Sequence, residues 1–157
     1  MIVSNSSCLI ILDKLGKLEL LERLYTKVII PVAVKSEVFK SKIKPYWIEV
    51  VEINQPIAPK ILKKTLGNGE SEAISLSLEL NADLLIIDDL AARKVAQELG
   101  IKITGVVGIL LTAKKIGLIQ EIKSLLDNML KHGFRISKAV YTGAIELAKE
   151  NQNANNN

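Results

Sequence analysis

The feature that constrains the fold most is the repeated alternation of short, purely apolar runs with longer amphipathic segments. The runs at residues 28–30 and 84–87 contain only Val, Ile and Leu. Such a run is typical of a strand whose two faces are both covered. The segments between the runs carry apolar residues at the spacing of helices. Strands that alternate with helices predict an α/β fold, with a small central parallel sheet and helices on both of its faces.

Turn and cap residues give approximate bounds for these elements. Strands are predicted at residues 2–4, 28–30, 48–53, 84–87 and 101–104, and helices at 9–15, 18–25, 32–39, 57–66, 70–81, 90–99, 106–115, 120–131 and 138–150. These bounds place Glu37 near the middle of its helix and Glu70 at the start of another. The 157 residues fit one domain, which we place at residues 1–150. The Asn-rich segment 151–157 is predicted to be a disordered polar tail.

The chain has one cysteine, Cys8, and one histidine, His132. A disulfide framework, a cysteine metal cluster and a multi-histidine zinc site are therefore excluded. Any bound metal is expected to have oxygen ligands, which favours Mg²⁺ or Mn²⁺. Cys8 itself is expected to be a buried apolar residue.

The overall composition limits the location and the partners of the chain. No apolar run approaches the roughly 20 residues that cross a bilayer, so no membrane association is expected. The first residues lack the features of a signal peptide, and a cytoplasmic location is expected. The net charge of +4 is compatible with a polyanionic partner.

Six acidic or amide residues follow a predicted strand or lie in a predicted helix near one edge of the sheet. They are Asn5, Glu37, Glu70, Glu72, Asp88 and Asp89. Ligands of parallel α/β sheets bind outside the carboxyl ends of the strands. Carboxylates that converge there repel one another, and a divalent cation relieves that repulsion. Such an ion can also orient water and stabilise charge on a scissile phosphate, so metal-assisted phosphodiester cleavage is the favoured chemistry.

Each of these residues also has an ordinary structural explanation. Asn5 and Asp89 can cap the helices that follow them, and acidic residues in a first helical turn, such as Glu70 and Glu72, interact favourably with the helix dipole. Glu37 and Asp88 can simply be solvated.

Four segments carry a resemblance to a known family. They are Ile2-Val3-Ser4-Asn5-Ser6-Ser7-Cys8-Leu9-Ile10, Ile30-Pro31-Val32-Ala33-Val34-Lys35-Ser36-Glu37-Val38, Gly69-Glu70-Ser71-Glu72-Ala73-Ile74 and Leu85-Ile86-Ile87-Asp88-Asp89-Leu90-Ala91-Ala92-Arg93. In order and spacing they resemble the motifs of PIN domains. The likeness is closest to small prokaryotic PIN proteins related to the toxin ribonucleases of toxin–antitoxin pairs. It continues through residues 105–110, 113–117 and 133–137.

The resemblance implies a three-layer α/β/α domain and an Mg²⁺- or Mn²⁺-dependent endoribonuclease. It further implies RNA as substrate, a small antitoxin as partner and a homodimeric state. By position, Glu37 matches the second-motif acid and Asp88 the fourth, with Asp89 as an additional metal ligand. The third-motif acid is matched by either Glu70 or Glu72, and both are retained.

The remaining positions concern the first motif and the nucleic acid. Ser6 or Ser7 matches the hydroxyl residue beside the first acid, and Arg93 is expected either to face phosphate or to form a surface ion pair. The first acid, usually Asp, is Asn5 here. An amide can bind Mg²⁺ through its oxygen but adds no charge, so metal affinity should fall. This departure keeps open an alternative, a catalytically weak or inactive PIN-fold module that binds RNA or protein. A small-molecule phosphohydrolase is disfavoured because the chain has no Gly-rich phosphate loop.

Overall fold

The computed structural model describes residues 1–150, and the predicted tail at 151–157 lies outside the described residues. Its sheet has five strands, all parallel, in the order β3-β2-β1-β4-β5. The strands are β1 (Ile2–Ser4), β2 (Val28–Pro31), β3 (Ile48–Val51), β4 (Leu84–Ile86) and β5 (Ile103–Thr104). The chain builds the sheet outward from β1 in one direction and then returns to build in the other. The switch point of the strand order therefore lies between β1 and β4, where ligands of such sheets bind.

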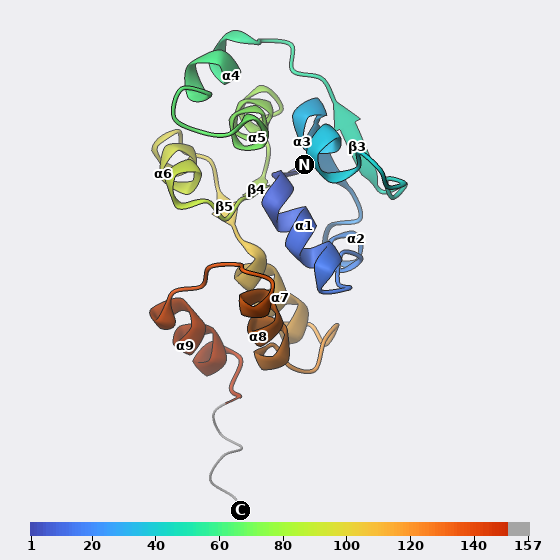
Figure 1. Cartoon of the computed structure of the whole chain (residues 1–157), viewed down its shortest axis with the longest axis vertical. Coiled ribbons are helices and arrows are strands. Elements are labelled where there is room, and N and C mark those ends of the chain that lie inside the picture. Colours follow the sequence, from blue (N-terminus) through green and yellow to red (C-terminus); the bar gives the residue numbers. More distant parts are fainter. Residues whose placement is uncertain (151–157) are drawn as a thin grey trace, which may run out of the picture.

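Helices connect and cover these strands (Figure 1). They are α1 (Ser6–Lys14), α2 (Leu20–Tyr25), α3 (Val32–Val38), α4 (Ile57–Leu62), α5 (Asn68–Glu79), α6 (Leu90–Glu98), α7 (Val106–Lys115), α8 (Lys123–Lys131) and α9 (Lys138–Leu147). No helix in residues 1–150 has both the length and the apolar character needed to cross a membrane.

The two faces of the sheet belong to two separate apolar cores. In β2, Val28 and Ile30 pack into a core shared with α1, α2, α7, α8 and α9, whereas Ile29 packs into a core shared with α5 and α6. The same alternation holds in β4, because successive side chains of a strand point to opposite faces. Both faces are thus covered, which confirms the predicted three-layer α/β/α architecture.

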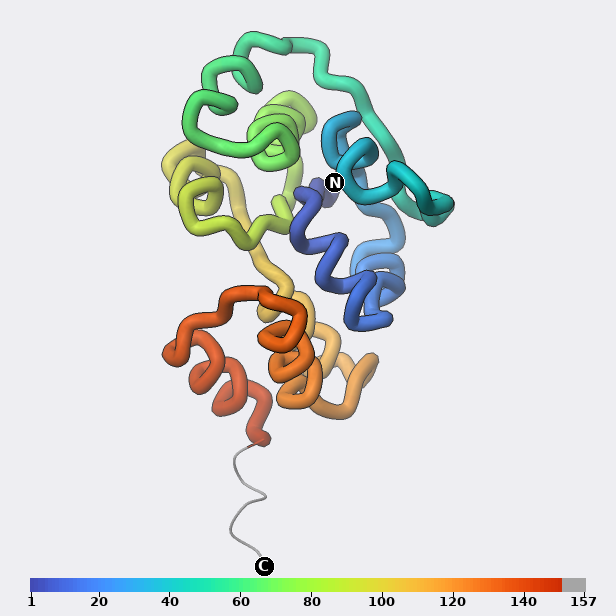
Figure 2. Tube along the Cα trace, in the orientation of Figure 1, coloured from blue at the N-terminus to red at the C-terminus, as the bar shows by residue number. Residues whose placement is uncertain are grey.

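Helices α7, α8 and α9 gather at one end of the molecule, beyond the carboxyl end of β5 (Figures 1 and 2). Their buried residues join the core of the α1 and α2 face. The connection between α8 and α9 consequently passes close to the carboxyl edge of the sheet, where it helps to form the site described below.

Several predicted bounds were wrong. Glu37 is the penultimate residue of α3 rather than near its middle, and α5 begins at Asn68, so Glu70 is its third residue. Helix α4 ends at Leu62 instead of continuing to residue 66, and α8 begins at Lys123 instead of residue 120. Apolar periodicity marks the middle of an element better than its ends, because the ends depend on capping partners.

Candidate functional site

The carboxyl ends of β1 and β4 meet at the switch point of the sheet. Ser4 pairs with Ile86 in the parallel register, and the backbone N–H of Asn5 donates to the Ile86 carbonyl at 3.0 Å. Asp88 follows β4 by two residues. The first and fourth motif segments are therefore neighbours in the structure, as the sequence predicts for a parallel sheet.

Asn5 is fully buried and caps α1. Its Oδ1 accepts from the backbone N–H of Cys8 at 3.3 Å, and its Nδ2 donates to Ser7 Oγ at 2.9 Å. The predicted capping role is confirmed. Both ends of the Asn5 amide are thus occupied by contacts within the first turn of α1.

Glu37 lies at the exposed end of α3, next to the first turn of α1. Its Oε2 accepts a hydrogen bond from the hydroxyl of the buried Ser6. Gly69 of α5 approaches the same point, since a Cβ on Gly69 would be 2.6 Å from Glu37 Oε2 and 2.7 Å from Ser6 Oγ. Three segments that are distant in the sequence meet here, and the absence of a side chain at residue 69 makes room for the carboxylate.

Asp88 is held from two sides by donors on its Oδ2. Cys8 Sγ donates at 3.0 Å from α1, and the backbone N–H of Val106 donates at 3.0 Å from the start of α7. Burial raises the pKa of the Cys8 thiol, and the charge and hydrogen bond of Asp88 raise it further, so the thiol stays protonated and remains a donor. A Cβ on Gly105 would overlap Asp88 Oδ1, so any larger residue at position 105 would displace the carboxylate or the start of α7.

The roles of Cys8 and Gly105 beside Asp88 were not predicted from the sequence. Cys8 is buried as expected, but it is also a polar partner of Asp88. The one available signal was that Cys8 and Gly105 belong to segments that resemble PIN motifs.

Glu70 and Asp88 line the same groove, which has a volume of about 1340 Å³. Ser7, Asp89 and Arg93 also line this groove, together with residues of α7 and of the α8–α9 connection. The half-buried Glu70 packs over Gly67, where a Cβ would overlap Glu70 Oε2. Of the two candidates for the third motif, Glu70 therefore lies with Asp88.

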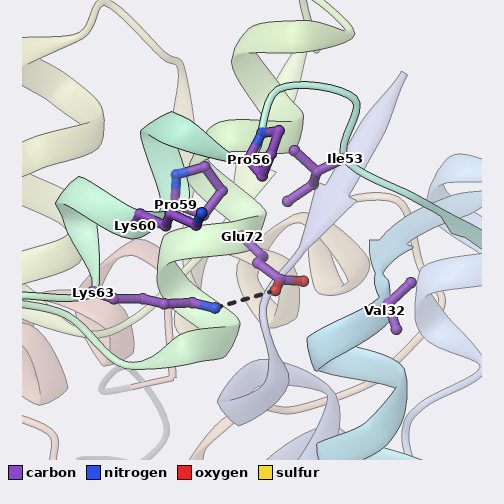
Figure 3. Close-up of a pocket in the computed structure, with 7 residues that line it drawn as sticks. All are labelled: Val32, Ile53, Pro56, Pro59, Lys60, Lys63 and Glu72. Carbon is purple, nitrogen blue, oxygen red and sulfur yellow. Dashed lines mark ion pairs between the residues drawn. The ribbon is translucent and has the colours of Figure 1, made fainter.

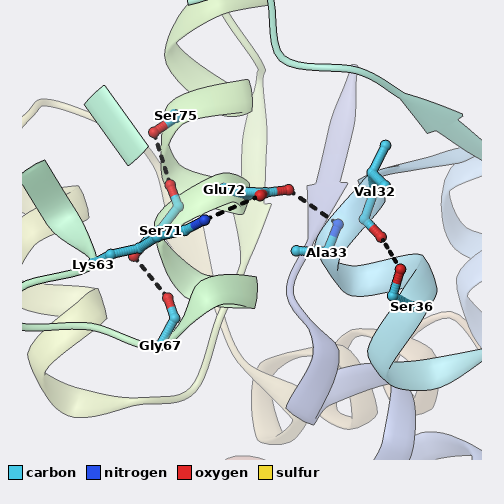
Figure 4. Close-up of polar contacts among 8 residues, drawn as sticks. All are labelled: Val32, Ala33, Ser36, Lys63, Gly67, Ser71, Glu72 and Ser75. Atoms are coloured by element: carbon cyan, nitrogen blue, oxygen red, sulfur yellow. Dashed lines mark hydrogen bonds and ion pairs between the residues drawn. The ribbon is translucent and has the colours of Figure 1, made fainter. Parts of the chain in front are cut away.

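Glu72 lies elsewhere, although only two residues separate it from Glu70. Its Oε2 accepts from the backbone N–H of Ala33 at 3.0 Å, and its Oε1 pairs with Lys63 Nζ at 3.5 Å (Figure 4). It lines a separate cavity of about 220 Å³ (Figure 3). Two residues turn an α-helix by about 200°, which puts the two side chains on opposite sides of α5. Glu72 caps the start of α3, where Pro31 provides no side-chain cap.

Asp89 and Arg93 are also engaged with the backbone around the end of β4. Asp89 caps α6 by accepting from the N–H of Ala92 at 2.8 Å, which confirms the predicted cap. Arg93 Nη1 donates to the Ile87 carbonyl at 2.9 Å. Within residues 1–150 Arg93 forms no ion pair, so its guanidinium remains available beside the groove.

The acids at the sheet edge form two adjacent groups, Glu37 beside Ser6 and Gly69, and Glu70 with Asp88 in the groove. Among residues 1–150, no three His, Cys, Asp or Glu side chains are arranged closely enough to hold one ion. The donor types nevertheless fit a hard divalent cation, because carboxylates and hydroxyls are its preferred protein ligands. The two groups are neighbours along the chain, because Gly69 and Ser6 lie beside Glu37 while the next residues, Glu70 and Ser7, line the groove.

A three-layer α/β/α domain with acidic residues at the switch point of a parallel sheet defines the class of this protein. A family model described as a PIN domain, DUF3368, matches residues 1–150, and the chain belongs to the PIN-domain family. PIN domains are commonly nucleases and generally use divalent metals. Comparisons with curated proteins and with solved structures found no match.

Proposed function

We propose that this chain is a Mg²⁺- or Mn²⁺-dependent endoribonuclease and the toxin component of a toxin–antitoxin pair. The observation that carries the proposal is the presence of Glu70 and Asp88 in one groove, at the switch point of a PIN-family sheet. Two carboxylates that face one groove repel each other, and this repulsion favours a bound divalent cation.

In this proposal Glu70 and Asp88 bind the metal from the groove and the side chain of Glu37 moves toward it, because no three acids of residues 1–150 are close enough to hold one ion as they stand. When bound, the ion supplies a Lewis acid and lowers the pKa of its water. The donors on Asp88 Oδ2 fix the orientation of that carboxylate. Preorganised ligands lose little freedom when substrate binds, which favours catalysis. Arg93, which lines the groove together with Asp88 and Ser7, would bind a phosphate of the RNA.

Glu72 and Asp89 have smaller parts in this proposal than the sequence alone suggested. Both carboxylates cap helices, α3 and α6, and removing either one leaves backbone N–H groups without a partner. Glu70 is therefore the proposed third-motif acid. Asn5 contributes shape and the cap of α1, and it adds no charge to the site.

The test is an RNA cleavage assay with Mg²⁺ or Mn²⁺ on wild type, Asp88→Asn and Glu70→Gln. Asn keeps an oxygen that can accept from Cys8 and Val106, so Asp88→Asn removes the charge without removing an acceptor. We expect both variants to lose at least about 10²-fold in rate. Cleavage by Asp88→Asn at the wild-type rate would refute the proposal.

Asn5 favours a second candidate, a non-catalytic PIN-fold module that binds RNA or a protein partner. Its amide oxygen and nitrogen each already have a partner in the first turn of α1, and its neutrality lowers the charge available to a cation. Calorimetric titration with Mn²⁺ separates the candidates. Binding by wild type supports the nuclease, whereas binding only by Asn5→Asp supports the module.

The toxin role includes a cytoplasmic location, an RNA substrate, a small antitoxin partner and a homodimeric state. Expression of the chain in a bacterial host should arrest growth, and Asp88→Asn should not. Sedimentation of the purified chain measures its oligomeric state, and a monomer at all concentrations would contradict the dimer.

A further inference from the structure

The groove extends well beyond the two acids. Its volume of about 1340 Å³ exceeds the roughly 300–1000 Å³ of pockets for small ligands. Its lining also includes residues of α7 and of the connection between α8 and α9, residues 132–137. The α8–α9 connection contributes no acid to the lining, so a ligand contact there would involve a part of the ligand that does not bind metal.

Positive charge borders this groove. The chain has three arginines, and two of them, Arg93 and Arg135, line it. Neither one forms an ion pair within the part of the chain that the structure describes. The planar guanidinium matches the geometry of phosphate and also stacks on aromatic rings.

The lining from the α8–α9 connection is also apolar and partly aromatic. Phe134, one of only two phenylalanines, lines the groove together with Ile136, and both side chains are partly buried against the core. Leu130 and Val140 add apolar surface, and they are 44% and 49% exposed. An aromatic side chain beside unpaired arginines suits a polymer that alternates apolar ring faces with anionic groups, and RNA is such a polymer.

We propose that the α8–α9 connection is an RNA-binding subsite, in which Phe134 contacts a base and Arg135 a neighbouring phosphate. The bound RNA then runs along the groove from this connection toward Glu70 and Asp88. The inference rests on the proposed function for the choice of RNA as ligand, but its test requires no cleavage.

The test is the binding of a fluorescent oligouridylate, measured by anisotropy in EDTA so that no metal-dependent cleavage occurs. Phe134→Leu keeps apolar packing but removes the aromatic face, and Phe39→Leu is the matched control outside the groove. Stacking of one base corresponds to a factor of about five or more in affinity. We expect Phe134→Leu to weaken binding by that factor, and Phe39→Leu to leave it unchanged.

Two further measurements identify the partner of each side chain. An abasic oligoribose phosphate should bind wild type and Phe134→Leu equally, and Phe134→Tyr should restore the binding of oligouridylate. For Arg135→Gln, the slope of log K against log salt should fall by about 0.7, as for one lost phosphate contact to a single strand. Arg23→Gln, at the third arginine, should not change the slope.

Equal binding by wild type, Phe134→Leu and Arg135→Gln overturns the subsite, whatever the cleavage assay shows. If the expected binding pattern is found but no variant and no wild-type protein cleaves RNA, the subsite is supported and the proposed nuclease activity is refuted. Thermal unfolding of each variant checks its fold, and Phe134→Tyr keeps the test informative if the leucine variant is unstable.

Discussion

The close approach of Gly69 to Glu37 predicts that Gly69→Ala changes the stability of the protein little but lowers its activity strongly. In Gly69→Ala, the new Cβ would be 2.6 Å from Glu37 Oε2, whereas ordinary contact begins at 3.4 Å. The carboxylate oxygen must therefore withdraw by about 0.8 Å. Ser6 Oγ must move by a similar amount, since its distance would be 2.7 Å.

The stability change should be small because two effects oppose each other. Alanine is favoured over glycine in a helix by about 0.5–1 kcal/mol. Forcing Glu37 or Ser6 from its rotamer costs about 0.5–1.5 kcal/mol. The free energy of unfolding should thus change by less than about 1 kcal/mol, which is a shift of roughly 2–4 °C in Tm.

The effect on activity should be much larger. Displacing a catalytic group by about 1 Å can cost 10²-fold in rate, so we expect a loss approaching that size in the RNA cleavage assay. The matched control is Gly143→Ala in α9, where a Cβ has no neighbour within 4 Å. That control should gain about 0.5–1 kcal/mol in stability and cleave like wild type. If folded Gly69→Ala cleaves as fast as Gly143→Ala, the position of Glu37 does not matter for the reaction.

Three other predictions follow from the contacts of single residues. Glu72→Ala should lower the free energy of unfolding by about 1–2 kcal/mol in urea titrations, because the cap of α3 is lost. The rate of RNA cleavage should stay within a fewfold of wild type. Loss of cleavage would show that Glu72 belongs to the catalytic site. Asn5→Asp should lower Tm without metal, since a buried charge replaces an amide, and Mn²⁺ should raise its Tm more than that of wild type; equal shifts would place Asn5 outside the metal site. Burial raises the pKa of Glu150, but hydrogen bonds from Lys114 and from the N–H groups of Ile122 and Lys123 outweigh it and lower the pKa below 4.5. The stability from Glu150 is therefore present above about pH 4.5 and lost as the pH falls through its lower folded pKa, and Glu150→Gln should flatten that part of the stability profile.

Local sequence patterns were sufficient to predict the layers of this protein. The apolar runs at residues 28–30 and 84–87 predicted strands covered on both faces, and parallel pairing then places all carboxyl ends at one edge. The caps Asn5 and Asp89 were also predicted correctly. A cap and its helix are adjacent in the sequence, so their signal is local.

Only the tertiary structure separated Glu70 from Glu72. Helical periodicity indicates that the two residues face different ways, but which one faces the groove depends on how α5 packs against α3 and α4. The bounds of α3 and α8 depend on similarly distant partners. Their first N–H groups bind Glu72 and Glu150, which lie 39 and 28 residues away from Ala33 and Ile122.

The partners of Asp88 show the same limit most clearly. Cys8 is 80 residues from Asp88, and its thiol becomes a donor to the carboxylate only because β1 and β4 are neighbours in the sheet. The sequence determined which elements form, because periodicity and capping act over a few residues. Packing determined which side chains meet, because close contacts between distant segments exist only after the sheet and its helices have assembled.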